Sequence, residues 1–289
     1  MPDGEVVAAP KASSAPALGA RRFGRVNWIG LWTLYQKEVQ RFLKVAFQTV
    51  FAPIITTLLY LTVFLVAFSG GDRDPSIEGQ LITYAQFLPP GLIMMAILSN
   101  AFQNASSSII IGKVQGSVID VLMPPLSPSE LTAAFVGGAA TRGILVGLIT
   151  AITIAFFMAF TTTTFAISNL LAIVYFATMA SILLGAVGAI AGMWAEKFDQ
   201  LALITNFVIT PLTFLSGTFY SVNKPGLPDW VAGVSNFNPL FYLIDGFRYG
   251  FIGVADAPVL RGAMVSLALT LLSVWATYIL FRRGYKLKA

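Results

Sequence analysis

Residues 143–195 read GILVGLITAITIAFFMAFTTTTFAISNLLAIVYFATMASILLGAVGAIAGMWA, and none of these 53 positions is Asp, Glu, Lys or Arg. One helix of that length would measure about 80 Å at 1.5 Å per residue, whereas the hydrocarbon core of a bilayer is about 30 Å thick. The stretch therefore predicts two membrane-spanning helices. Its polar run, Thr161 to Thr164 followed by Ser168 and Asn169, is expected to form the turn between them.

Uncharged stretches on either side of this one are also long enough to cross a bilayer as helices. They are residues 45–71, 79–112, 200–223 and 262–281. The whole chain is 56% hydrophobic and 11% charged, whereas a soluble domain carries about a quarter charged residues. The sequence therefore predicts an all-α integral membrane protein rather than a soluble enzyme. Its six transmembrane helices are expected at about 47–68, 84–111, 131–160, 170–194, 201–221 and 259–281.

Several kinds of catalytic and metal chemistry are excluded by composition. The chain has no histidine and no cysteine, so catalytic triads, thiolate nucleophiles, disulfides and imidazole or thiolate metal sites are absent. Its only Gly-Lys pair, Gly112-Lys113, lacks the other residues of a phosphate-binding P-loop. We therefore expect no enzymatic activity and no bound cofactor or metal. Every Asp and Glu falls in a predicted loop, interface or helix end, which disfavours an ion-driven transporter.

The N-terminal residues differ in composition from the rest of the chain. Residues 1–26 are rich in Ala, Pro, Ser and Gly and predict a disordered cytoplasmic tail rather than a cleaved signal peptide. The remainder, 27–289, is expected to form one membrane domain. Within it, residues 28–46 place apolar side chains at helical spacing opposite Gln and basic residues. This pattern predicts an amphipathic helix in the membrane interface, with its basic side chains near anionic lipid.

The distribution of the basic residues predicts the orientation of the chain. Thirteen of the 18 Lys and Arg residues fall on one side of the predicted spans, and four fall on the other. By the positive-inside rule both termini are then cytoplasmic. The net charge of +5 is thus explained by membrane topology, and no nucleic-acid partner is expected.

Residues 226–254 do not fit the pattern of six spans. They are apolar and aromatic, but prolines divide them into pieces too short to cross a bilayer. We expect two short re-entrant helices in the outer leaflet, shielded by protein. Asp245 and Arg248 are three residues apart, and an ion pair within one short helix is the simplest interpretation of both charges.

Two residues inside the spans need an explanation. Arg142 lies about a dozen residues into the third span, where an arginine costs about 2.5–3.5 kcal/mol. It could bind an anionic substrate or join a polar network in the bundle. Alternatively, the third helix could begin late, or the side chain could extend to the cytoplasmic interface. Pro211 lies in the middle of the fifth span among Thr and Ser residues. It predicts a kink whose free carbonyls are satisfied by hydroxyls, with a gating hinge as the alternative.

The loop 112–130, GKVQGSVIDVLMPPLSPSE, carries a short apolar patch between glycines and prolines. A short amphipathic helix here could dock into a groove on a partner protein. The alternative is a plain turn that leads into the third span.

Three ordered blocks of the sequence resemble type-2 ABC transporter permeases, the membrane subunits of bacterial and archaeal exporters that work with a separate ATPase. The most specific block is PLTFLSGTFYSVNKPGLPDWVAGVSNFNPLFYLIDGFRYGFIG, Pro211–Gly253. The others are FLPPGLIMM, Phe87–Met95, and VLMPPLSPSEL, Val121–Leu131. The resemblance extends from Trp28 to the C-terminus. The sequence departs from the family pattern at Pro225-Gly226, which leaves open where the first re-entrant helix begins.

The resemblance implies a permease domain over 27–289 with a coupling helix in the loop 112–130. It implies contact with the ATPase through Glu38, Arg41, Gln115, Asp120, Val121, Leu122, Pro125 and Pro128. It also implies a re-entrant cap that contains Trp230, Asn238, Pro239, Asp245 and Arg248. ATP and Mg would be bound by the cognate ATPase, and two permease chains, identical or paralogous, would form the conduit.

We therefore expect the membrane subunit of an exporter in the cytoplasmic membrane. A hydrophobic, lipid-linked, polysaccharide or drug-like substrate is compatible with apolar spans, because apolar contacts discriminate poorly. A secondary transporter or channel, a membrane-embedded lipid-modifying enzyme and a scaffold for the ATPase are the alternatives.

Overall fold

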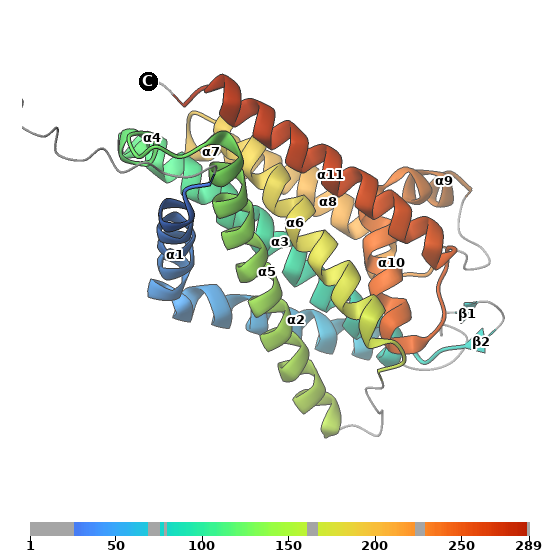
Figure 1. The fold of residues 1–289 in the computed structure, drawn as a ribbon. Coiled ribbons are helices and arrows are strands. Elements are labelled where there is room, and N and C mark those ends of the chain that lie inside the picture. The colour runs from blue at the N-terminus through green and yellow to red at the C-terminus, as the bar shows by residue number, and fades with distance from the viewer. Residues whose placement is uncertain (1–25, 69–75, 78–79, 161–166, 223–228, 288–289) are drawn as a thin grey trace, which may run out of the picture.

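A computed structural model of the chain describes residues 26–68, 76–77, 80–160, 167–222 and 229–287 (Figure 1). The predicted tail therefore lies, except for Val26, outside the described residues. The predicted turn at Thr161 to Thr164 and the departure at Pro225-Gly226 also lie outside them.

The described residues are almost entirely helical, as predicted. The elements are α1 (Trp28–Lys44), α2 (Ala46–Phe68), β1 (Ser76–Ile77), β2 (Gln80–Leu81), α3 (Tyr84–Val114), α4 (Val118–Leu122), α5 (Pro128–Ala159), α6 (Leu170–Trp194), α7 (Phe198–Ile204), the π-helical turn η1 (Thr205–Ile209), α8 (Thr210–Thr213), the π-helical turn η2 (Phe214–Thr218), α9 (Asp229–Phe237), α10 (Pro239–Ile252) and α11 (Val259–Arg283). The short strands pair antiparallel between α2 and α3.

Six helices in the described part of the chain are long and apolar enough to span a membrane. They are α2, α3, α5, α6, the segment Phe198–Thr218 formed by α7 to η2, and α11. This confirms the predicted all-α fold with six spans. The observed helices α3 and α5 are longer than needed to cross hydrocarbon, at 31 and 32 residues.

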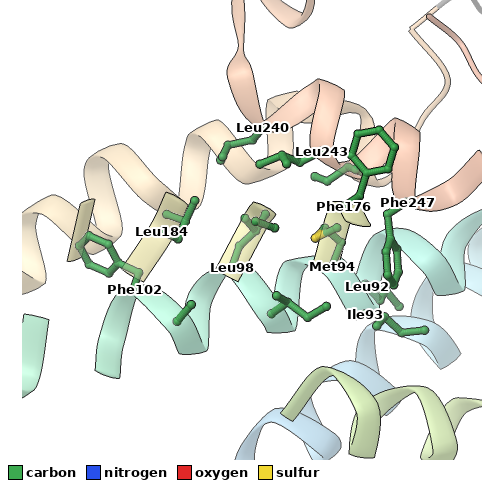
Figure 2. Close-up of a cluster of buried hydrophobic side chains, with 14 of the residues drawn as sticks. Leu92, Ile93, Met94, Leu98, Phe102, Phe176, Leu184, Leu240, Leu243 and Phe247 are labelled. Atoms are coloured by element: carbon green, nitrogen blue, oxygen red, sulfur yellow. The ribbon is translucent and has the colours of Figure 1, made fainter. Parts of the chain in front are cut away.

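The helix α3 is the centre of the bundle. It packs against α6 and α5 along its length and against α10 near its start. Its buried residues lie on all sides, which fits a helix surrounded by protein. Figure 2 shows Leu92, Met94, Leu98 and Phe102 of α3 meeting Phe176 and Leu184 of α6 and Leu240, Leu243 and Phe247 of α10.

Small residues allow these helices to approach closely. A Cβ atom on Gly188 of α6 would lie 2.4 Å from the carbonyl oxygen of Phe102 in α3, and one on Gly192 would lie 2.8 Å from that of Ser106. Gly138 and Gly143 of α5 are similarly close to α1 and α3. The glycines on either side of Arg142 therefore allow α5 to pack closely against α1 and α3 through van der Waals contact.

The two ends of the bundle are structurally different. One end carries α4, the start of α5 and the end of α11, and α1 lies beside it (Figure 1). We call it the α4 end. The opposite end carries α9, the short strands and the loop before α11, and we call it the α9 end.

Candidate functional site

At the α4 end, the chain between α3 and α5 forms a short helix that leaves the bundle surface. Gln115 caps the end of α3, and Gly116 adopts a left-handed conformation with φ of +70°, which glycine reaches without strain. The five-residue helix α4 follows, and none of its residues is buried. The short helix predicted in the loop 112–130 is therefore present.

The residues of α4 and its flanks expose apolar side chains beyond the ends of the spans. Ile119 is 64% exposed and Met123 is 77% exposed, and Leu122 and Val114 are exposed as well. Next to them is a cavity of about 650 Å³, which also contacts Lys113, Glu196 and Lys286. We call α4, Met123 and this cavity the α4 surface. An apolar patch rimmed by charged residues is typical of a protein interface.

Charged groups hold the rim of the α4 surface in place. The Nζ atom of Lys113 donates to the carbonyl oxygens of Met193 (2.7 Å) and Ala195 at the end of α6. Lys286 donates to the carboxylate of Glu196 at 2.7 Å. This hydrogen bond lowers the pKa of Glu196 and raises that of Lys286. Both groups are therefore charged at neutral pH, and the rim offers both signs of charge.

Most of the predicted coupling residues lie together at this end. Gln115, Asp120, Leu122 and Pro125 are exposed, whereas Val121 and Pro128 are partly buried. Pro128 is the first residue of α5, where its missing N–H costs no helical hydrogen bond.

Glu38 and Arg41 lie beside α4 but face inward. Glu38 is buried and accepts a hydrogen bond from the hydroxyl of Ser108 at 2.7 Å. Arg41 donates to the backbone oxygen of Asn104 at 2.7 Å and forms an ion pair with Glu38 at 3.3 Å. Both also contact a cavity of about 160 Å³ that reaches α4. These two residues therefore join α1 to α3, and their predicted contact with the ATPase stays a prediction.

A buried carboxylate that the sequence analysis did not single out joins α1 to α5. Glu130 accepts hydrogen bonds from the backbone N–H of Ser127 (2.7 Å) and of Asn27 (2.6 Å). Ser127 in turn caps the first turn of α5. The spacing Ser127-x-x-Glu130 is a capping box and could have revealed this residue. Asn27 caps α1, so one carboxylate organises the starts of two helices.

At the α9 end, the helix of the fifth span is broken within the block Pro211–Gly253. Its backbone stays helical past Pro211, and the hydroxyl of Thr210 donates to the carbonyl of Thr205 at 2.9 Å. The sequence predicted a kink at Pro211, whereas the non-helical residues of this span are Ser216 and Gly217. Gly217 is left-handed, with φ of +73°.

Arg248 of α10 binds the broken end of that helix. Its Nη2 atom donates to the carbonyl oxygen of Gly217 at 2.7 Å and lies 3.5 Å from that of Thr218. Its guanidinium lies 3.7 Å from the ring centre of Phe87 in α3. The side chain is fully buried.

The predicted ion pair between Asp245 and Arg248 is wrong. Asp245 instead accepts hydrogen bonds from the backbone N–H groups of Asp256 and Ala257, each at 2.9 Å. The i,i+3 spacing leaves both side chains near each other, but each finds a closer partner in another segment. Asp245 thereby holds the loop before α11, and Arg248 holds the end of the fifth span.

The other residues of the predicted cap occupy the short helices α9 and α10. Asn238 is buried, caps α10 and donates to the carbonyl of Leu212 at 2.6 Å. Pro239 is the first residue of α10, and Trp230 of α9 is exposed. Two short helices therefore lie where the prediction placed them, within 229–252.

Arg142 lies inside the bundle rather than at a late helix start. α5 begins at Pro128, so Arg142 is well within it. Its Nη2 atom donates to Oδ1 of Asn100 in α3 at 3.2 Å. It also lines a cavity of about 640 Å³ between α2 and α3. Of the two functional interpretations, the link to another helix is therefore present.

Comparison with known proteins agrees with this arrangement. Residues 30–252 match the ABC-2 type transporter family. The chain is also 35% identical over 263 residues to the inner membrane transport permease YadH of Escherichia coli K12, covering 91% of this chain and 98% of that one. The chain belongs to the ABC-2 type transporter family.

More distant relatives of this ABC-2 chain are nodulation proteins. Nodulation protein J of Rhizobium leguminosarum bv. viciae is 25% identical over 239 residues, with 82% of this chain and 86% of that one covered. Nodulation protein J of Rhizobium meliloti is 23% identical over 231 residues, covering 78% and 82% respectively. The resemblance drawn from the sequence blocks is thus confirmed, and this ABC-2 chain is a component of a transporter.

Proposed function

We propose that this chain is the permease subunit of an ATP-driven exporter. It lies in the cytoplasmic (inner) membrane with both termini in the cytoplasm, and it pairs with a second permease chain. A separate ABC ATPase binds ATP and Mg and supplies the energy. Two observations support this proposal. The sequence has no P-loop, and its E. coli relative is an inner membrane transport permease.

The observation that carries the proposal is the α4 surface. Ile119 and Met123 are largely exposed and lie beyond the predicted spans, at the end that carries the excess of basic residues. Exposed apolar side chains outside the bilayer are costly unless a partner covers them. An ATPase bound here would bury the apolar side chains of Ile119 and Leu122. Its own charged residues could form ion pairs with Lys113, Glu196 and Lys286 at the rim.

The contacts of α1 suggest how movement at this surface reaches the spans. α1 is joined to α3 by Glu38 and Arg41 and to α5 by Glu130. A displacement of α4 by the ATPase would act on α3 directly and on α1 and α5 through these polar contacts. Coupling requires that this group of helices has two conformations, and that both the ATPase and the substrate shift the equilibrium between them.

We also propose that α9 and α10 form a re-entrant cap in the outer leaflet. At 9 and 14 residues they are too short to cross a bilayer. The buried side chains of Asn238, Asp245 and Arg248 each form hydrogen bonds with backbone groups of neighbouring segments, as irregular structure at membrane depth requires. The substrate of the exporter is hydrophobic, lipid-linked, a polysaccharide or drug-like.

Replacing Leu122 with Asp tests the proposed ATPase contact. A carboxylate buried in an apolar interface without a partner loses several kcal/mol of binding, so we expect co-purification with the ATPase to fall about 100-fold or more. Because Leu122 is exposed in the permease alone, membrane insertion and melting temperature should stay unchanged. Pull-down of the tagged permease from membranes that contain both proteins measures the effect.

Leu260→Asp is the matched control, because Leu260 is an exposed leucine at the first turn of α11, at the α9 end. It should leave co-purification unchanged. Wild-type recovery of the ATPase with Leu122→Asp would contradict the assigned contact. Substrate flux into vesicles that is the same with and without the ATPase would contradict ATP-driven export altogether and favour a secondary transporter.

A further inference from the structure

The cavity between α2 and α3 carries positive charge without a matching acid. Arg41 of α1 and Arg142 of α5 both line this space of about 640 Å³, and no Asp or Glu is among the described residues that line it. Glu38 pairs with Arg41 outside the lining, at 3.3 Å. Among the residues that the structure describes, Arg142 has only the neutral amide of Asn100 as a hydrogen-bond partner.

Most of the hydrogen-bonding capacity of Arg142 is unused. A guanidinium has five N–H donors, and the described contacts of Arg142 occupy one of them. The Nε atoms of Arg142 and Arg41 are both buried without a hydrogen-bond partner. A charged group held in this way is stabilised when an anion joins it, because charge and donors are then satisfied together.

The rest of the lining is part polar and part apolar. Hydroxyl and amide side chains such as Thr56, Ser99 and Gln103 lie near the arginines, and Ala52 and Leu92 contribute apolar surface. The opposite side of α2 exposes Phe51, Ile55 and Leu59, as expected for a helix that faces lipid. The cavity therefore lies on the side of α2 that faces away from these exposed apolar side chains.

We propose that this cavity binds the phosphate headgroup of a membrane amphiphile, with Arg142 and Arg41 as its ligands. Arginine matches the tetrahedral oxygens of a phosphate with two donors at once, and the apolar part of the lining accepts the start of an acyl or prenyl chain. The cavity is built from the halves of α2 and α3 nearer the α4 end. In the orientation of the proposed function this is the inner leaflet, where an exporter collects its cargo.

This inference rests on the proposed function for its orientation, but its test does not use the ATPase. Dioleoyl phosphatidate and dioleoylglycerol have the same chains and differ in the phosphate. Binding of each to the full-length chain in a neutral detergent is measured by native mass spectrometry. We expect phosphatidate to bind about 10-fold tighter or more, the equivalent of one charge-assisted hydrogen bond.

Substitutions at two positions, Arg142 and Asn100, test whether the lipid binds in this cavity. Arg142→Gln should remove most of the preference for phosphatidate, and Arg142→Lys should keep part of it. Asn100→Asp places a carboxylate where the amide oxygen now lies, 3.2 Å from Arg142, and should also remove the preference while raising the melting temperature. Because Asn100→Asp keeps the size of the side chain, it separates loss of binding from loss of fold. Arg282→Gln, at an exposed arginine at the end of α11, should bind like the wild type.

Equal binding of the two lipids, or a preference that survives both Arg142→Gln and Asn100→Asp, would overturn the proposal. Glycerol 3-phosphate that displaces phosphatidate with equal affinity would assign the site to a soluble phosphate and would overturn the membrane source. Neither result would affect the ATPase contact, which the pull-down of Leu122→Asp tests independently.

Discussion

Replacing Arg248 with Met is expected to lower the free energy of unfolding by about 3–5 kcal/mol. The substitution leaves the carbonyl oxygens of Gly217 and Thr218 without their buried donor and removes the guanidinium from the ring of Phe87. A buried acceptor left unsatisfied costs about 1–3 kcal/mol, and a desolvated cation–π contact contributes about 2 kcal/mol. Because the side chain is fully buried, water cannot replace it as a donor.

Thermal unfolding of the purified chain in detergent, followed by tryptophan fluorescence, measures this effect. Arg248→Lys should recover only part of the stability. A planar guanidinium can lie over the ring of Phe87 and donate to Gly217 at the same time, whereas a compact ammonium cannot make both contacts. Arg261→Met is the matched control, since Arg261 is exposed at the start of α11. A melting temperature for Arg248→Met that equals that of Arg261→Met would show that Arg248 does not hold the end of the fifth span.

The spans could be predicted from sequence because the length and charge of a stretch are local properties. The 53 uncharged positions of 143–195 exceed one membrane crossing whatever surrounds them. The short helices α4 and α10 were also predictable, because glycine and proline limit them on both sides. Helix boundaries shifted by a few residues where capping, rather than hydropathy, decides the end, as at Ser127 and Pro128.

The partners of the buried charges could not be predicted in the same way. Arg248 reaches a carbonyl 31 positions away, and Arg142 reaches an amide 42 positions away. The sequence spacing of Asp245 and Arg248 indicates that they share a helix face, but it does not reveal which other segment offers a closer partner. Likewise, the proline at 211 was more conspicuous than Gly217, although the break lies where the left-handed residue is tolerated.

Gly188 of α6 gives the second large prediction, because its packing is against backbone rather than side chain. A Cβ atom there would lie 2.4 Å from the carbonyl oxygen of Phe102 and 3.1 Å from its Cα atom. A flexible side chain could move away from such a contact, but the backbone of α3 cannot, since α3 is packed on all sides. Gly188→Leu is therefore expected to separate α6 from α3 and to lower the free energy of unfolding by about 3 kcal/mol.

The same thermal unfolding experiment measures the loss, and Gly233→Leu is its control. Gly233 is also a helical glycine, in α9, but nothing lies within 4 Å of the position of its Cβ atom. That substitution should leave the melting temperature unchanged or raise it slightly, because leucine favours a helix over glycine by about 1 kcal/mol. Equal melting temperatures for Gly188→Leu and Gly233→Leu would show that α3 and α6 can separate without loss of stability. The central position of α3 in the bundle would then be wrong.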